Sequence, residues 1–295
     1  MLNRQPKPLP PAGRAVVITG ASSGLGKECA IRLGQRGFRV FAGVRTVEDG
    51  ERLCAEAPSA RLRPVRLDVT DEESLRAAAA EVAGSVGEQG VWGLVNNAGT
   101  CLSAPLECVP PERLRAQLDT NVVGALAVSQ AFLPQLRRSR GRIVNISSGL
   151  GSMAIPYLGV YATGQFAKEG LSDALRRELR PFGVSVCVVK PGAIATPIWG
   201  KVREAGEEFL NGAPEDVAGR YRASFERFLR MNEQRAQSST TRPEDYARTV
   251  FRALTAHRPR TRYCVGTDAR AAAALSRLLP DAALDRVLGA VTKAQ

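Results

Sequence analysis

A repeated alternation of short β-branched runs and longer amphipathic stretches most constrains the fold of this 295-residue chain. Each run has the length of a buried strand, and the stretches between them have the apolar spacing of helices. The runs cover residues 14–19, 38–44, 63–69, 92–99 with its closing polar turn, 141–148, 184–189 and 262–266. This order predicts an α/β fold built on a Rossmann-type, doubly wound parallel sheet, and the near-continuous apolar strands fit burial on both faces.

The domain organisation follows from the same pattern. The sequence contains no internal repeat and no dividing linker, so we expect one domain over residues 13–270. The proline content of residues 1–12 predicts a disordered tail. These residues lack the apolar core of a secretory signal, so we do not expect a signal peptide there. Residues about 197–240 break the alternation; they are polar and helix-prone, with scattered aromatics, and predict a helical substrate lid. Residues 271–295 predict a C-terminal helical extension.

Composition excludes several classes of site. His257 is the only histidine, so a His-cluster metal site is impossible and we expect no metal. The six cysteines show no paired short spacing of the metal or redox kind, which favours reduced thiols packed as small hydrophobes. No run of about 18 apolar residues occurs, so no membrane span is expected and a cytoplasmic location is the default.

The formal charge of +12 raises the question of nucleic-acid binding. The arginines are scattered along helices among acidic residues, and no motif that combines aromatic and basic residues for RNA binding is present. We therefore expect no nucleic-acid partner. A basic surface can still steer a phosphorylated ligand toward a cleft.

A glycine-rich turn, Gly20-Ala21-Ser22-Ser23-Gly24-Leu25-Gly26, joins the first strand to a helix. In this context the pyrophosphate of a dinucleotide binds the free N–H groups of the helix N-terminus. The spacing G-x-x-x-G-x-G differs from the more familiar G-x-G-x-x-G. Taken alone, the turn also fits an ordinary Gly/Ser turn before a helix.

The end of the second strand bears on the choice of coenzyme. An NAD site has an acidic residue there to bind the ribose 2′-hydroxyl. This chain has Val44, followed by Arg45. A guanidinium can grip a 2′-phosphate with paired hydrogen bonds, so NADP(H) is favoured over NAD(H). The alternative is one more surface arginine in an arginine-rich chain.

The candidate chemistry lies between residues 144 and 165. The hydroxyl of Ser148 closes an apolar strand, the phenol of Tyr161 follows thirteen positions later, and the amide of Gln165 stands one helical turn beyond the phenol. Asn121 lies inside a predicted helix over residues 111–136. Because asparagine is a weak helix former, its position indicates a backbone irregularity or a specific partner.

Together these motifs resemble the short-chain dehydrogenase/reductase family, over roughly residues 12 to 270. The tail after Tyr221 is loosely similar to a subgroup acting on retinoid- or steroid-like alcohols and ketones, the retinol/17β-hydroxysteroid dehydrogenase type. The residues that carry the family resemblance are Thr19 to Gly26, Asp68-Val69, Asn96 to Gly99, Asn121, Ser148, Tyr161 and Pro191-Gly192.

The resemblance implies hydride transfer between NADP(H) and the carbinol or carbonyl carbon of a small-molecule substrate, and the aromatics of the expected lid suggest that this substrate is apolar. It implies that Tyr161 is the acid/base, that Ser148 binds the same oxygen, and that Asn121 holds a water in the proton relay. The implied coenzyme-binding residues are Gly20, Ser22, Ser23, Gly24, Leu25, Gly26, Arg45, Asp68, Val69, Asn97, Ala98, Gly99, Tyr161, Gln165, Pro191, Gly192, Ile194 and Thr196. It also implies a homodimer or homotetramer paired through the helices that carry Asn121 and Tyr161.

Gln165 departs from the family pattern, which has a lysine that hydrogen-bonds the nicotinamide ribose and lowers the tyrosine pKa. Glutamine keeps hydrogen-bond donors but supplies no charge. Lys168 is the nearest cation along the helix, with its Cα roughly 10 Å from that of Tyr161. Two interpretations remain: an enzyme with a slower or more alkaline proton step, or a dinucleotide-binding scaffold with little chemistry.

Overall fold

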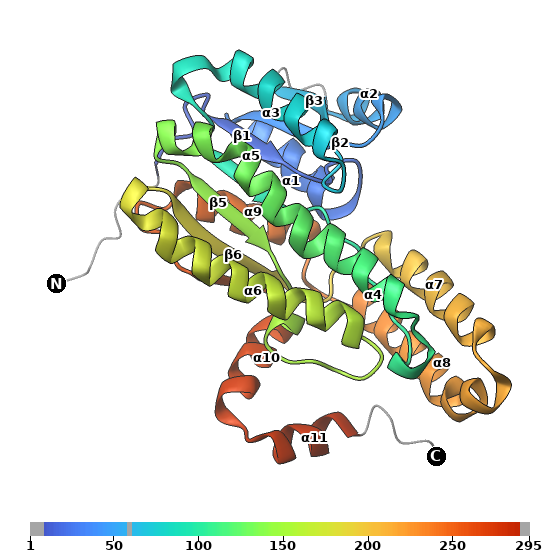
Figure 1. The fold of residues 1–295 in the computed structure, drawn as a ribbon. Coiled ribbons are helices and arrows are strands. Elements are labelled where there is room, and N and C mark those ends of the chain that lie inside the picture. Colours follow the sequence, from blue (N-terminus) through green and yellow to red (C-terminus); the bar gives the residue numbers. More distant parts are fainter. Residues whose placement is uncertain (1–8, 58–60, 290–295) are drawn as a thin grey trace.

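The computed structural model describes residues 9–57 and 61–289 and contains a seven-stranded, entirely parallel sheet in the order β3-β2-β1-β4-β5-β6-β7 (Figure 1). The strands are β1 (Ala15–Ile18), β2 (Arg39–Val44), β3 (Leu62–Arg66), β4 (Gly93–Asn96), β5 (Arg142–Ile146), β6 (Ser185–Pro191) and β7 (Arg262–Val265). The strand order reverses between β1 and β4, which makes this a doubly wound sheet. The predicted fold class is confirmed.

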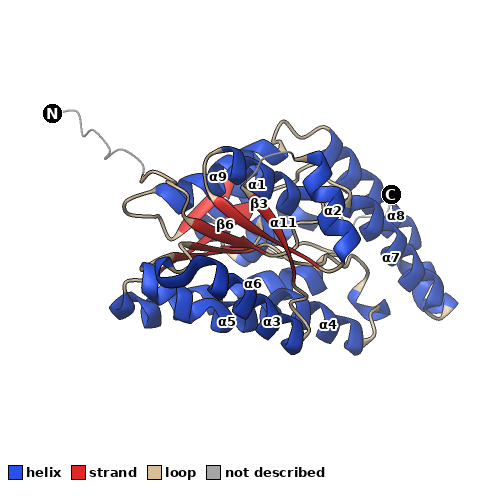
Figure 2. Cartoon of the chain, turned by 90° about the horizontal axis from the view of Figure 1, so that it is seen from above, coloured by secondary structure: helices blue, strands red, loops and turns tan. Residues whose placement is uncertain are grey.

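Helices cover both faces of the sheet, as Figure 2 shows with α1 and α9 on one side and α3, α5 and α6 on the other. The first face carries α1 (Gly24–Gln35) and α9 (Pro243–Thr255), with α2 (Val47–Glu56) packed at the β2–β3 edge. The second carries α3 (Glu72–Val86), α5 (Gly124–Ser139) and α6 (Gly159–Leu179). Short 3₁₀ turns lie at Gly87–Gln89, Leu106–Cys108, Gly149–Gly151 and Arg180–Phe182.

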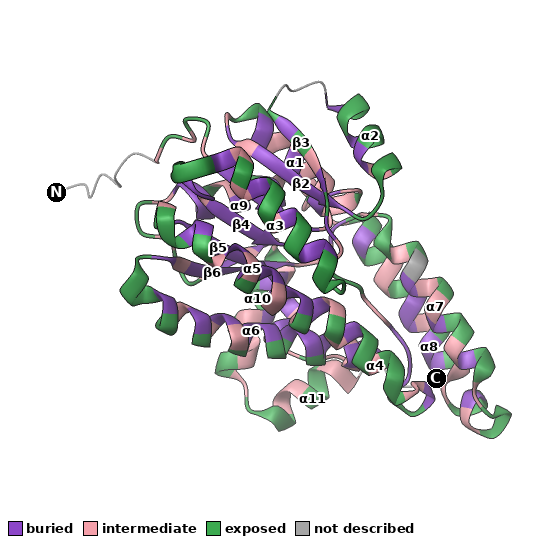
Figure 3. Ribbon diagram, turned by 45° about the horizontal axis from the view of Figure 1, so that its top comes forward, coloured by how far each residue is buried: buried purple, intermediate pink, exposed green. Residues whose placement is uncertain are grey.

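The central strand β1 shows why the strands read as continuous apolar runs. Val16 and Ile18 belong to the core on the α1 and α9 face, and Val17 belongs to the core under α3 and α5. All three are 0–1% exposed, and Figure 3 shows the strands of the sheet coloured mostly as buried. Successive side chains of a strand point to opposite faces, so a sheet covered on both faces needs apolar residues at every position.

The predicted irregularity at Asn121 is present. A regular helix α4 (Pro111–Leu118) passes into a π-helical turn (Asp119–Val123) and then into α5. Such π turns are rare and frequently mark functional positions. The turn brings Gly124 so close to the strand end that a Cβ there would lie 2.9 Å from the Val69 carbonyl oxygen.

Residues 197–240, where a helical lid is expected, form two long helices, α7 (Ile198–Gly212) and α8 (Glu215–Gln237). In Figure 1 this helical hairpin projects away from the sheet. Two of its aromatics, Phe225 and Phe228, pack against Tyr157 of the loop before α6, with ring centroids 5.3 Å from the Tyr157 ring in each case. These rings, buried in a separate apolar cluster, hold the hairpin against the loop before α6.

The described N-terminal end is tied to the domain by a hydrogen bond, and the described C-terminal end consists of two helices. Of the expected tail, residues 1–8 lie outside the described residues, while the Leu9 backbone N–H donates to the Thr255 carbonyl at 2.7 Å. At the other end α10 (Thr267–Leu278) and α11 (Asp281–Gly289) are separated at Pro280, and residues 290–295 lie outside the described part. Within the described residues, no helix has the length and apolar character needed to cross a bilayer.

Candidate active site

The sequence motifs meet at the carboxyl ends of the parallel strands, and the glycine turn after β1 is the most tightly constrained of them. Gly20 and Gly24 have φ of +65° and +55°, a region that glycine adopts without strain. A Cβ at Gly26 would lie 2.1 Å from the Gly20 carbonyl oxygen. Side chains are therefore excluded from the turn at Gly20 and Gly26, which leaves its backbone able to approach a ligand closely.

The N-terminus of α1 opens directly from this turn. The N-cap residue Ser23 is extended, with φ of −155°, and its side chain makes no capping hydrogen bond. The first N–H groups of α1 are thus left without a side-chain cap, next to the half-buried Ser22 and Leu25. A helix start of this kind binds phosphate groups, so the turn fits a dinucleotide pyrophosphate.

The loop after β4 is tied to the glycine turn by hydrogen bonds. The Thr19 hydroxyl oxygen accepts from the backbone N–H groups of Asn97 and Ala98, at 3.0 and 2.9 Å. The Asn97 amide donates to the carbonyls of Thr19 and Gly20, at 3.0 and 3.1 Å. Its amide oxygen accepts from the Tyr246 hydroxyl of α9 at 2.9 Å, a contact that no local sequence pattern indicated. These bonds fix the stretch Asn97 to Gly99 beside the turn.

Asp68 and Arg45 lie together at the β2–β3 edge of the site. Burial favours a raised pKa for the Asp68 carboxyl, but hydrogen bonds from the Thr70 N–H and hydroxyl, with the charges of Arg45 and Arg66, hold that pKa below its usual value. Asp68 is therefore ionised and positioned, and Val69 beside it is buried. Arg45 is exposed at the end of β2, where its guanidinium is free to meet an anion.

The loop after β6 is held by a residue that sequence reasoning missed. The Asp268 carboxylate of α10 accepts from the Ala193 N–H at 2.7 Å, and a Cβ at Gly192 would lie 1.8 Å from that carboxylate. Farther along the loop Ile194 is buried, and Thr196 approaches the glycine turn, since a Cβ at Gly24 would lie 3.8 Å from the Thr196 Cβ. The loop from Pro191 to Thr196 thus closes the site opposite the β4 loop.

Ser148 and Tyr161 are brought together at the end of β5. Burial raises the pKa of the Tyr161 phenol, the nearby Cys101 thiol adds to the rise, and a hydrogen bond with Ser148 acts in the opposite direction. The Ser148 hydroxyl oxygen also accepts from the Leu150 N–H at 3.2 Å, which fixes its side chain. Cys101 was not among the expected site residues; its own pKa is raised by burial to about 12, so it stays a neutral thiol.

Asn121 supports the wall of this site. Its amide oxygen accepts from the Thr100 N–H and its amide nitrogen donates to the Thr100 carbonyl, both at 2.8 Å. Both ends of the side chain therefore hold the loop that carries Cys101. Gly164 of α6 packs against it, since a Cβ there would lie 3.8 Å from the Asn121 Cβ. The expected part of Asn121 in a water relay stays a prediction.

Gln165 and Lys168 are both buried on α6, at 3% and 1% exposed. The Gln165 amide oxygen has no hydrogen-bond partner among the described residues. The Lys168 ammonium donates to the Ile146 carbonyl at 3.1 Å, and burial lowers its pKa to about 8. The cation whose reach was in question is therefore directed at the end of β5, two residues before Ser148.

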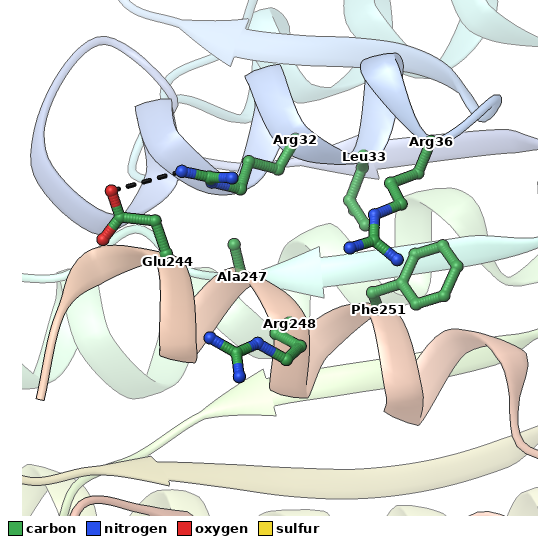
Figure 4. A pocket seen from close by; sticks show the side chains of 7 residues that line it. All are labelled: Arg32, Leu33, Arg36, Glu244, Ala247, Arg248 and Phe251. Carbon is green, nitrogen blue, oxygen red and sulfur yellow. Dashed lines mark ion pairs between the residues drawn. The ribbon is translucent and has the colours of Figure 1, made fainter.

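A hollow elsewhere on the surface contains none of the expected site residues. It lies between α1 and α9, has a volume of about 250 Å³, and is lined by three arginines (Figure 4). Arg32 pairs with Glu244 across it at 3.2 Å, and the Arg36 guanidinium lies over the Phe251 ring. Within the described residues, no cluster of three or more His, Cys, Asp or Glu side chains could hold a metal ion.

Comparison with known proteins agrees with this geometry. The sequence model of a family described as short chain dehydrogenase matches residues 14–207. The chain belongs to this family. It is an oxidoreductase, since its curated relatives are named dehydrogenases and reductases.

Three relatives illustrate the range of the family. The chain is 41% identical to 3-amino-tetrahydro-pyrrolizinone reductase of Xenorhabdus hominickii, over 92% of this chain and 93% of that protein. It is 36% identical to retinol dehydrogenase 5 of Mus musculus (97% and 91% covered). It is 38% identical to 17-beta-hydroxysteroid dehydrogenase type 6 of Bos taurus (92% and 87% covered). The predicted likeness to the retinol/17β-hydroxysteroid dehydrogenase subgroup is confirmed.

Solved structures agree on the fold. A short chain dehydrogenase of Burkholderia cenocepacia J2315, in complex with NADP, superposes with a TM-score of 0.73 at 26% identity, over 95% of this chain and 99% of that one. A short-chain dehydrogenase of Streptomyces avermitilis gives 0.71 at 28% identity, with 95% of each chain covered.

Proposed function

We propose that this chain is an NADP(H)-dependent oxidoreductase that interconverts a primary or secondary alcohol and a carbonyl on an apolar small molecule. The observation that carries the proposal is the placement of the Ser148 hydroxyl beside the Tyr161 phenol, at the same sheet edge as the glycine turn. A positioned hydroxyl beside a phenol suits proton transfer to a carbonyl oxygen, and the uncapped start of α1 suits a dinucleotide.

In this proposal the bound nicotinamide coenzyme supplies the hydride in reduction or accepts it in oxidation. During reduction Tyr161 gives its phenolic proton to the substrate oxygen, and Ser148 donates a hydrogen bond to the same oxygen. The buried phenol has a raised pKa, so leaving a negative charge on it is unfavourable. Gln165 offers hydrogen bonds to the ribose but carries no charge of its own, so we expect a proton step that is slower or more alkaline than it would be with a lysine at this position.

The preference for NADP(H) rests on Arg45 at the end of β2. An exposed guanidinium can bind a 2′-phosphate with paired, charge-assisted hydrogen bonds. The Burkholderia neighbour was solved with NADP, which supports the proposal without deciding it.

An apolar substrate is suggested by the walls around the phenol. Cys101, Leu150 and Ile155 lie with Tyr161 at the edge of the apolar cluster that continues into the α7–α8 hairpin. Burying an apolar ligand against such walls is favourable. The names of the retinol and 17-beta-hydroxysteroid dehydrogenase relatives suggest retinoids and steroids as the first compounds to test.

A homodimer or homotetramer through α4–α5 and α6 stays a prediction. It is supported by Val123 and Phe166, apolar side chains that are 55% and 47% exposed on these helices. Light scattering on the purified chain measures the state directly, and a monomer at every concentration would contradict it.

Two assays test the proposed function. NADPH binding is measured by the change in its fluorescence, and reduction of apolar aldehydes and ketones is then followed across a pH series for the parent and for Gln165→Lys. We expect both proteins to bind NADPH, and the lysine variant to reduce substrate faster, with its profile moved to lower pH. Equal rates and profiles would mean that the protein supplies the charge from another residue.

The scaffold interpretation predicts a different result in the same assays. It expects the parent to bind NADPH without turnover, and Gln165→Lys to gain turnover. Failure of both proteins to bind either coenzyme would contradict the proposed function and the scaffold alike.

A further inference from the structure

The buried Lys168 stands in a position that costs free energy. Its ammonium is 1% exposed and has one recorded acceptor, the Ile146 carbonyl, although an ammonium has three N–H donors. No carboxylate in the described part of the chain forms an ion pair with it. Burying a charge without a counter-ion is unfavourable, so stability alone does not explain this lysine.

Lys190 shows how the same fold treats a buried lysine that is paired. It is 3% exposed, and its ammonium lies 3.1 Å from the Glu169 carboxylate and also donates to the Ser152 hydroxyl. Its charge is therefore balanced where it stands. Lys168 is as buried as Lys190, but no carboxylate among the described residues pairs with its ammonium.

Two buried polar side-chain atoms that lie close along the chain to Lys168, or to its acceptor Ile146, have no hydrogen-bond partner among the described residues. The Gln165 amide oxygen is buried without a partner among the described residues, three positions earlier on the same helix, and residues at this spacing are neighbours on a helix surface. The Ser147 hydroxyl, next to Ile146, is also buried without a partner. Lys168 thus has unused donors, and Gln165 and Ser147 have unused acceptors, on the two segments that carry Tyr161 and Ser148: α6 and the residues directly after β5.

We propose that Gln165 and Lys168 together perform the work of a single active-site lysine. In this proposal the Lys168 ammonium, which donates to the Ile146 carbonyl in the structure, rotates to donate a hydrogen bond to the unpartnered Gln165 amide oxygen, and the Gln165 amide nitrogen then faces the coenzyme ribose. The positive charge of Lys168 stabilises the phenolate that Tyr161 becomes when its proton moves to the substrate oxygen. Lys168 is then a positioning residue that acts through Gln165, and the inference rests on the proposed function.

The charge of Lys168 depends on pH because burial lowers its pKa to about 8, so the ammonium is present below that pH and lost above it. The other charged groups near α6 are occupied elsewhere. On β6 and β7, Lys190 pairs with Glu169, while Arg262 binds Glu169 and Asp173 at 2.7 and 3.2 Å. On β5, Arg142 donates to the Ala253 and Ala256 carbonyls. Burial keeps the Cys187 thiol of β6 neutral by raising its pKa to about 12, and Asp119 on the π turn is exposed.

The first experiment observes the contact itself and needs no turnover. The side-chain amide of Gln165 is followed by ¹H–¹⁵N NMR in the full-length protein, assigned by its loss in Gln165→Lys, while the pH is raised through 8. We expect its signal to move with a midpoint near the Lys168 pKa in the parent and to stay still in Lys168→Met. A signal that stays still in the parent, or moves equally in both proteins, overturns the inference and leaves the proposed function untouched.

The second experiment measures the pH dependence of reduction. Lys168→Met is expected to lower kcat about tenfold, the equivalent of one pKa unit in the phenol, and to remove the fall in rate above pH 8. Lys190→Met is the matched control, because its charge is already balanced, and its profile keeps that fall. Thermal unfolding of each variant verifies its fold, and Lys168→Gln serves if the methionine variant does not fold.

The double variant Gln165→Lys with Lys168→Met completes the cycle. If the charge is what matters, a lysine at 165 makes the loss of Lys168 harmless, and the double variant recovers the rate of Gln165→Lys alone. A double variant as slow as Lys168→Met would show that Lys168 supports the fold only, and would overturn the inference. Absence of NADPH binding in the parent would instead contradict the proposed function.

Discussion

The two ends of the coenzyme site are built on different physical principles. The glycine-turn end, from Gly20 to Gly26 with its β4 loop, is defined by backbone: positive φ angles, contacts that exclude a Cβ, and hydrogen bonds from main-chain groups. The phenol end, around Tyr161, is defined by side chains and their charges, with a raised phenol pKa and a buried cation behind it.

This difference explains where the family pattern is kept and where it is not. A backbone cradle has no substitute, because a side chain at Gly26 would overlap the Gly20 carbonyl. A charge acts over a distance, especially in a buried site, so it can be supplied from a neighbouring position. The chain keeps the glycine turn and departs from the family at Gln165.

The largest expected effect tests the glycine-turn end of the coenzyme site. In Gly26→Ala the new Cβ would lie 2.1 Å from the Gly20 oxygen and 2.4 Å from the Asn97 amide nitrogen. We expect NADPH affinity to fall roughly 1,000-fold, about 4 kcal/mol, because the turn must move away. Fluorescence titration measures it. Gly84→Ala, with no atom within 4 Å of the new Cβ, is the control and should bind as the parent does.

The next effect concerns the phenol end. Tyr161→Phe removes the proton donor and is expected to lower kcat for carbonyl reduction at least 100-fold, the lower range for a general acid. Tyr221→Phe is the matched control, because Tyr221 lies on α8 of the hairpin and its hydroxyl donates to Glu107 of the 3₁₀ turn Leu106–Cys108 at 2.6 Å. Similar rates in Tyr161→Phe and Tyr221→Phe would remove the phenol from the mechanism.

Much of the site could be predicted because its motifs are local. The glycine turn, the strand ends at Asp68 and Ser148, and the irregular helix at Asn121 each show in a few adjacent residues. The supports could not be predicted in this way. Tyr246 reaches Asn97 across 149 residues and Asp268 reaches Ala193 across 75, so only the packed sheet brings them together.

Lys168 shows the same limit in a different form. Its spacing from Tyr161 along the helix could be counted, but its usefulness depends on burial and on the Ile146 carbonyl of another element. The helical hairpin was similarly half predicted: polarity and helix propensity indicated a helical lid, while its division into two helices and the packing of Phe225 and Phe228 against Tyr157 required the fold. Sequence gives position along an element, and packing decides what the side chain meets.

A smaller expected effect separates recognition of the 2′-phosphate by Arg45 from binding of the coenzyme by the backbone of the glycine turn. Arg45→Ala is expected to weaken NADPH binding roughly 10- to 50-fold, the value of charge-assisted hydrogen bonds to a phosphate, and to leave NADH binding unchanged. Arg61→Ala, exposed and bonded to the Gly37 carbonyl, is the control. If Arg45→Ala weakens both coenzymes equally, Arg45 does not read the 2′-phosphate.

The smallest effect asks whether the buried cation is kept at a cost in stability. The pKa of Lys168 falls from 10.5 to about 8 on folding, so below pH 8 the folded state holds a charge that burial disfavours. Between these values the folded state releases the proton first, and stability rises with pH. Lys168→Met should therefore raise the free energy of unfolding by about 1–2 kcal/mol at pH 7, with the gain shrinking toward pH 10.5, as measured by urea denaturation. Lys190→Met should instead destabilise, because it removes one of the two cations that pair with the buried Glu169 carboxylate and leaves Arg262 alone to balance it. A parent more stable than Lys168→Met at pH 7 would make Lys168 a structural residue. The charge near Tyr161 would then not have been supplied from a neighbouring position of the helix.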